Sequence, residues 1–216
     1  MERHTAIPQS AALTAPFAQG GLIIGITGPT GSGKTTLLQL IAQMGGLVLD
    51  CDAIYHQLLR TDPSLLSAIE ARFPGTVRQN ALDRKALGAI VFADSQALQD
   101  LNTITHAAVK AEVLRQLSQK PALAAIDAIG LFEGGLAPLC QVTVAVTAPE
   151  ALRITRLMAR DGITESYARS RIAAQHPAAW YAERCDYTLE NDTTPATFTG
   201  KCLAFLEKLG IMKEKM

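Results

Sequence analysis

The chain has 216 residues, of which 48% are hydrophobic, enough for one medium-sized α/β domain with a sizeable core. Lys plus Arg number 20 and Asp plus Glu number 20, and this balance argues against a nucleic-acid or membrane-surface partner. Four dispersed cysteines without a C-x-x-C pair suit a reduced, cytoplasmic protein. We expect residues 1–20 to be a flexible leader and 21–216 to form a single domain.

In chain order, the hydrophobic pattern predicts strands that alternate with helices. An apolar, β-branched run at 22–27 predicts a buried strand, and a glycine-rich segment then leads into a helix that begins at Lys34. Further strands are predicted at 47–50, 122–127, 141–146 and 186–189, with helical patterns over 53–118, 149–175 and 198–209. This alternation predicts a three-layer α/β/α fold with a five-stranded parallel sheet. No strand is predicted within 53–118, the expected substrate-binding lobe.

The segment from Gly28 to Thr35 has the pattern of a P-loop between a strand and a helix. Its glycines allow backbone amides to face a polyphosphate, and the following helix adds its positive end. We expect Lys34 to reach the terminal phosphates of ATP and the Thr35 hydroxyl to bind Mg²⁺. The residues predicted to bind the nucleotide here are Gly28, Pro29, Thr30, Gly31, Ser32, Gly33, Lys34, Thr35 and Thr36. The sequence lacks the Asn-Lys-x-Asp and Leu-Ser-Gly-Gly-Gln motifs, which favours a small-molecule kinase.

Carboxylates follow two of the predicted strands. Asp50 and Asp52 lie at the end of the second strand, and we expect them to point to opposite faces, so that only one reaches the reaction. We favour Asp52 as the group that accepts a hydroxyl proton, with an N-cap for a helix near Ala53 as the alternative. Asp127 is placed to bind Mg²⁺, or else simply ends its strand, and Glu133 follows near the substrate or the metal.

Arginines recur along the predicted helix that follows Pro149. Arg153, Arg156 and Arg160 share one helical face, which suits either a solvated surface or a lid over a transferring phosphoryl group. We favour the lid for Arg156 and Arg160, and expect Arg169 and Arg171 to be surface residues.

Together these segments resemble the dephospho-coenzyme A kinase family over residues 21–191. The matching pieces occur in the family's order: the P-loop with its strand, Leu49-Asp50-Cys51-Asp52, Leu82-Asp83-Arg84-Lys85-Ala86-Leu87, Ile90-Val91-Phe92, Leu101-Asn102-x-Ile104-x-His106, Asp127 to Glu133, Arg156-Leu157-Met158-Ala159-Arg160, Arg171-Ile172-x-x-Gln175 and Cys185-Asp186-x-x-x-x-Asn191.

The resemblance implies a P-loop kinase, like the nucleoside monophosphate kinases, that uses ATP to phosphorylate the ribose 3′-hydroxyl of dephospho-coenzyme A. It implies that Asp52 is catalytic, that Arg156 and Arg160 act from a lid at about 149–176, and that Asn191 lies near adenine. The helical region at about 53–118 would bind the acceptor. The residues expected at the acceptor are Asp52, Arg84, His106 and Glu133. We expect a monomer or a weak oligomer.

Two segments differ from the family pattern, and both lie on the expected acceptor side. His106-Ala107 stands where the family usually has His-Pro, and Ile129-Gly130-Leu131 stands where it usually has Pro-Leu-Leu. His106 could equally be a helix-start residue. A kinase of another small-molecule or nucleoside acceptor and a non-catalytic ATP-binding regulatory protein are therefore the alternative readings.

Overall fold

The computed structural model describes residues 21–211, and the expectation for residues 1–20 lies outside this range. Its centre is a five-stranded parallel sheet in the order β2-β5-β1-β6-β7, which confirms the predicted sheet. The strands are β1 (Leu22–Thr27), β2 (Leu47–Asp50), β5 (Leu123–Asp127), β6 (Val142–Thr147) and β7 (Tyr187–Glu190). Because β5 lies between β1 and β2, Asp50 stands in register beside Asp127 at the carboxyl edge.

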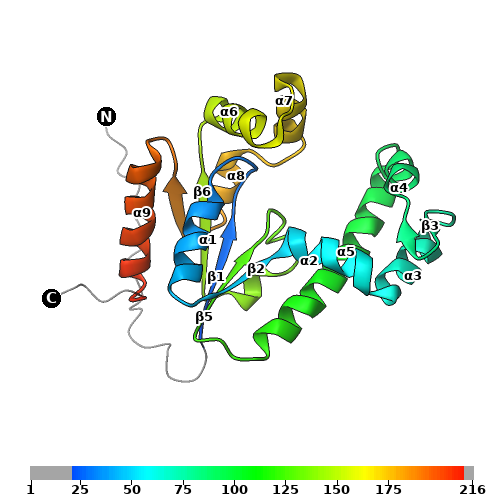
Figure 1. Cartoon of the computed structure of the whole chain (residues 1–216), viewed down its shortest axis with the longest axis horizontal. Helices are drawn as coiled ribbons and strands as arrows, with labels where there is room; N and C mark the ends of the chain where they lie inside the picture. Colours follow the sequence, from blue (N-terminus) through cyan, green and yellow to red (C-terminus); the bar gives the residue numbers. More distant parts are fainter. Residues whose placement is uncertain (1–20, 212–216) are drawn as a thin grey trace.

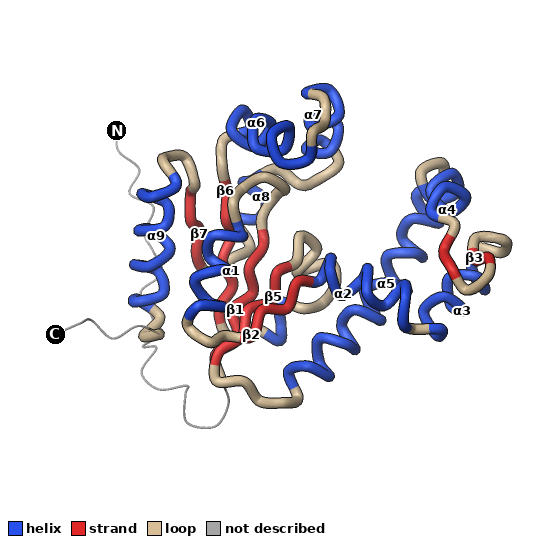
Figure 2. The backbone as a smooth tube through the Cα atoms, viewed as in Figure 1, coloured by secondary structure: helices blue, strands red, loops and turns tan. Residues whose placement is uncertain are grey.

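Helices cover both faces of the sheet, as the continuous apolar strands require (Figure 2). On one face, α1 (Lys34–Gln43) and α9 (Pro195–Lys208) pack on Ile24, Ile26 and Val144, which are fully buried. On the other face, a second cluster joins β2 and β5 to α2 (Cys51–Thr61), α5 (Ser95–Leu117) and the segment around the 3₁₀ turn η1 (Ala137–Leu139). The three layers hold the carboxyl edge of the sheet rigidly.

The helices α2 to α5 form a lobe that projects from the β2 side of the sheet (Figure 1). Between α2 and α5 lie α3 (Pro63–Arg72) and α4 (Arg84–Val91), and this lobe has its own core around Ile69 and Phe73. Each of the four helices begins after an aspartate whose carboxylate accepts backbone N–H groups of the first turn. These N-caps are Asp50, Asp62, Asp83 and Asp94.

The prediction that this lobe contains no strand is wrong. A short antiparallel hairpin joins β3 (Val77–Arg78) to β4 (Ala81–Leu82). Its two turn residues, Gln79 and Asn80, have φ values of 51° and 59°, as a tight hairpin turn with left-handed residues requires. Strands of two residues are too short to show a periodic pattern. The one local indication of the turn is Asn80, because asparagine tolerates the left-handed conformation.

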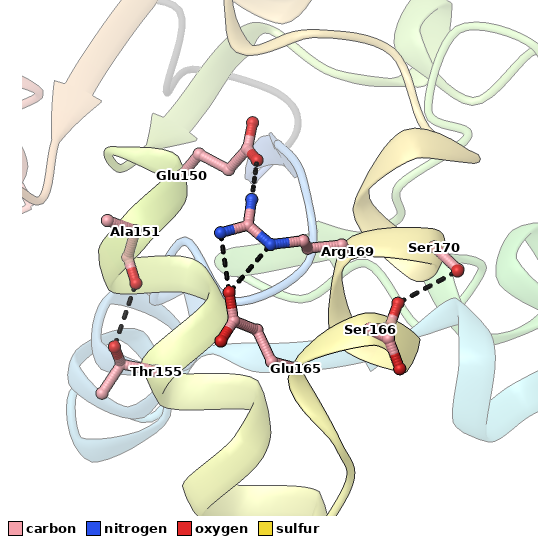
Figure 3. A network of polar contacts seen from close by, with 7 residues as sticks. All are labelled: Glu150, Ala151, Thr155, Glu165, Ser166, Arg169 and Ser170. Carbon is pink, nitrogen blue, oxygen red and sulfur yellow. Dashed lines mark hydrogen bonds and ion pairs between the residues drawn. The ribbon is translucent and has the colours of Figure 1, made fainter.

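Above the sheet edge, the predicted helical stretch at 149–175 is two helices. The first, α6 (Glu150–Asp161), ends at Gly162 in the left-handed conformation, and α7 (Glu165–Ala173) follows. Arg169 of α7 bonds Glu150 and Glu165 on the outer surface and so links the two helices (Figure 3). The short helix α8 (Ala178–Ala182) leads back to β7. No helix among residues 21–211 is both long enough and apolar enough to cross a membrane.

The turn from β1 into the P-loop admits only glycine at position 28. Gly28 has a φ of 130°, and a Cβ added there would lie 2.1 Å from the Val146 carbonyl oxygen. We expect Gly28→Ala to lower the free energy of unfolding by at least about 2 kcal/mol, because strain and a backbone clash add. Gly45→Ala is the matched control: Gly45 also has a positive φ, but a Cβ there meets nothing within 4 Å, so about 1 kcal/mol is expected. Equal losses in urea unfolding would contradict this account.

Candidate active site

A cleft of about 680 Å³ lies at the carboxyl edge of the sheet, between the P-loop and the α6–α7 helices. It brings together residues predicted from four separate segments of the sequence. The predicted residues that line it are Thr30, Gly31, Gly33, Lys34, Thr35, Asp52, Asp127, Arg156 and Arg160. Gly28, Pro29, Ser32 and Thr36 do not line the cleft, although they belong to the same loop and helix start.

The start of α1 is suited to an anion. Gly33 is its N-cap with a φ of 101°, no side chain caps the helix, and its first turn contains no acidic residue. The first amides of a helix have no acceptor within it, so they and the helix dipole favour phosphate oxygens. The Lys34 ammonium donates to the Gly28 carbonyl at 3.0 Å. Burial lowers the pKa of Lys34, while Asp127 and Asp52 oppose that shift.

The carbonyl groups of the P-loop are bonded to side chains from distant segments. Arg156 of α6 donates to the carbonyls of Gly31 and Ser32 at 3.3 and 3.4 Å. Asn191 follows β7, donates to the Ser32 carbonyl at 2.9 Å and accepts from Arg156 at 3.1 Å. Asn191 is buried and both ends of its amide are occupied, so here its side chain supports the loop. Its predicted contact with adenine stays a prediction.

Asp127 has the properties of a metal-binding carboxylate. Burial raises its pKa to about 6, with Lys34 opposing the shift and Asp50 and Asp52 adding to it. Among the described residues, its buried Oδ1 has no hydrogen-bond partner. With the exposed Thr35 hydroxyl in the same cleft, Asp127 offers the hard oxygen ligands that Mg²⁺ prefers. Within residues 21–211, no group of three or more His, Cys, Asp or Glu side chains is arranged to hold a metal ion.

The expectation that Asp50 and Asp52 point to opposite faces of a strand is wrong. Residues two apart in a strand share a face, and here the strand ends at Asp50 while the helix α2 begins at Cys51, so the two aspartates do not belong to one strand. Asp50 caps α2 by accepting from the Ala53 amide at 2.9 Å, and Asp52 lies exposed in the first turn of that helix. Both line the cleft, but only Asp52 keeps its carboxylate free of a capping role.

The α6–α7 helices add two residues that the sequence reading missed. Arg160 bonds Asp161 at 2.7 and 3.0 Å, and Arg171 bonds the same carboxylate at 2.6 Å. These bonds, with that of Arg160 the larger effect, lower the pKa of Asp161 to about 2. Arg171, expected at the surface, lines the cleft, and so does Gln175. Both belong to the family-like segment Arg171-Ile172-x-x-Gln175, and this was the available signal.

Of the four residues expected at the acceptor, two meet in a second cavity. This cavity of about 160 Å³ adjoins the cleft and is lined by Asp52 and His106, together with Gly130. Glu133 pairs with the His176 imidazole at 3.0 Å, and His176 stacks on the Trp180 ring. Arg84 lines neither cavity and contacts His56 Nδ1 at 3.2 Å on the exposed lobe.

Comparison with known proteins gives a consistent result. Residues 22–196 match the family model described as dephospho-CoA kinase. The curated dephospho-CoA kinase of Anaeromyxobacter dehalogenans is 38% identical over 87% of this chain and 92% of its own length, and that of Geobacillus kaustophilus is 34% identical over 87% and 96%. A Thermus thermophilus protein of known structure, 33% identical, superposes with a TM-score of 0.76 over 88% of this chain and 99% of its own. With the P-loop, its supporting side chains and the cleft carboxylates in place, the chain belongs to the dephospho-CoA kinase family.

Proposed function

We propose that this enzyme transfers the γ-phosphoryl group of ATP to the ribose 3′-hydroxyl of dephospho-CoA, the last step of coenzyme A synthesis. The observation that supports it most is the position of Asp52, which lines both the phosphate cleft and the smaller cavity at the helical lobe. A carboxylate shared by a donor site and an acceptor site is what direct phosphoryl transfer between them requires. The family match supplies the identity of the acceptor.

Each residue of the cleft has a distinct task in this proposal. The amides at the start of α1 and the Lys34 ammonium hold the phosphate oxygens in place. Asp52 accepts a hydrogen bond from the acceptor hydroxyl and takes its proton as the new P–O bond forms. Arg156 and Arg160 neutralise charge on the transferring group.

Mg²⁺ fits the oxygen ligands of this site, with Asp127 and Thr35 as the residues that would hold it. When bound, it supplies positive charge that screens the phosphates from the cleft carboxylates.

The lobe formed by α2 to α5 is proposed to bind the acceptor, and α6 with α7 to act as the lid. The smaller cavity is lined by residues of α2 and α5, such as Tyr55 and His106, and by the segment that follows β5, such as Gly130, which supports this division. The cytoplasmic location and the monomeric or weakly associated state stay predictions.

The acceptor is tested with a panel assayed for ADP release. We expect dephospho-CoA to give the highest kcat/KM, well above nucleosides, gluconate and shikimate, because binding energy from the rest of the acceptor orients its hydroxyl. A clear preference for another acceptor would support the alternative kinase, and ATP binding without turnover on any acceptor would support the regulatory protein.

The role of Asp52 is tested by Asp52→Asn, which keeps the shape but cannot take a proton. We expect kcat to fall by a factor of about 10²–10⁴, with the dissociation constant for ATP within a few-fold of the wild type. Asp62→Asn is the matched control, since Asp62 caps α3 in the same lobe away from the cleft. Unchanged turnover in Asp52→Asn would remove this residue from the mechanism.

The partly buried carboxyl group of Asp127 predicts a pH dependence of stability in protein free of Mg²⁺ and nucleotide. Its pKa is raised from 3.8 to about 6, so the folded state binds more protons and loses stability as pH rises through this range. The cost at pH 7 is on the order of 1–3 kcal/mol. We expect Asp127→Asn to be more stable than the wild type at pH 7 and to lose this advantage near pH 4. A difference in unfolding free energy that does not change with pH would contradict this.

A further inference from the structure

The peptide groups around Thr30, in the middle of the P-loop, are held by one side chain from α6 and one from the segment that follows α7. The Thr30 carbonyl accepts from Arg153 Nε at 2.8 Å, and Arg153 belongs to α6. The Thr30 amide donates to Gln175 Oε1, also at 2.8 Å, and Gln175 follows the end of α7. Thr30 itself is buried. Two well-formed hydrogen bonds therefore fix the same loop residue, one at its donor and one at its acceptor.

The loop also touches the backbone of α6 directly. A Cβ added at Gly31 would lie 3.0 Å from the Arg153 carbonyl oxygen, so the two backbones are in close contact. Any displacement of α6 must therefore move Thr30 and Gly31 or break these contacts. The loop and the helix form one mechanical unit.

Burying the charged guanidinium of Arg153 lowers the stability of the fold unless another interaction offsets its desolvation. The residue is only 4% exposed, and among the described residues its buried NH2 group has no hydrogen-bond partner. A buried guanidinium with an unused donor destabilises a fold by desolvation. Its charge acts on the phosphate site, because Arg153 is one of the groups that lower the pKa of Lys34.

We propose that Arg153 and Gln175 are positioning residues, which clamp Thr30 from the lid and hold the P-loop in the shape that binds the phosphates. The sequence pattern supports a lid role for Arg153 less than for Arg156 and Arg160, and it includes Gln175 only as the last residue of the family-like segment Arg171-Ile172-x-x-Gln175. The two hydrogen bonds to Thr30 link nucleotide binding to the position of the lid. A phosphate chain that stabilises the loop also stabilises the placement of α6 and α7, and the placed lid in turn favours phosphate binding. This inference rests on the proposed function only in that the loop binds a nucleotide.

The test uses two single variants of the full chain, Arg153→Met and Gln175→Leu. The dissociation constants of each variant for ATP and for inorganic tripolyphosphate are measured by calorimetry. Each variant loses one net hydrogen bond to the loop, so both dissociation constants should rise about five- to tenfold. The two ligands should be affected in parallel, because the clamp acts on the phosphates and not on the base. In turnover assays, KM for ATP should rise while KM for the acceptor changes less than twofold. Arg153→Lys, which keeps a donor and the charge, should recover most of the loss.

Arg169→Met is the matched control. It removes an arginine of the same lid whose hydrogen bonds go to Glu150 and Glu165 (Figure 3), so ATP binding should be unchanged. The double variant should be weakened by less than the product of the single effects, because both bonds act on one residue. Melting curves show whether each variant is folded. If Arg153→Met does not fold, the test relies on Gln175→Leu, because Gln175 is only half-buried.

The proposal is overturned if both folded single variants bind tripolyphosphate as the wild type does. It is also overturned if Arg169→Met weakens ATP binding equally, or if the KM values for ATP and acceptor rise together. None of the binding measurements uses an acceptor, so their outcome is independent of whether dephospho-CoA is the substrate.

Discussion

The rest of the site depends on the hydrogen bonds that hold the carbonyl groups of the P-loop. A glycine-rich loop gains flexibility in the unfolded chain and needs external bonds to keep one shape. Here the successive carbonyls of Thr30, Gly31 and Ser32 accept hydrogen bonds from the side chains of Arg153, Arg156 and Asn191. These bonds form within the protein and require no bound ligand. The amides at the start of α1 are left for an anion. The sheet supplies the position of the loop, and these side chains supply its conformation.

Several charged side chains lie close together at the carboxyl edge of the sheet, and their burial and mutual repulsion destabilise the free protein. Burial lowers the pKa of Lys34 and raises that of Asp127 to about 6, so both groups lose hydration on folding. Asp50 and Asp52 add negative charge in the same cleft. A bound polyphosphate would pair with Lys34, and its cation would pair with the carboxylates. Without them, the desolvation of these groups lowers the stability of the free protein. This is the usual relation between stability and activity at a functional site.

The sequence predicted the features that depend on local pattern. The strands β1, β2, β5, β6 and β7 came from apolar β-branched runs, and the P-loop came from its glycines and Lys34. The features it did not predict depend on tertiary contacts or on very short elements. The β3–β4 hairpin has strands of two residues, too short for periodicity. Arg153 and Gln175 meet at Thr30 across more than a hundred residues of sequence, and no spacing rule reports such a contact. The change from strand to helix at Asp50 altered how the paired aspartates face the cleft, because boundaries are the least certain part of any sequence pattern.

In the mechanism that we propose, the cleft passes a phosphoryl group from ATP directly to the ribose 3′-hydroxyl of an acceptor that lies beside Asp52. The most direct measurement is the position of the new phosphate, determined by phosphorus NMR on the product formed from ATP and dephospho-CoA. We expect a single product phosphorylated at the 3′-hydroxyl, with one ADP formed for each product molecule. A phosphate at the 2′-hydroxyl, or ADP released with free phosphate and unchanged acceptor, would contradict it.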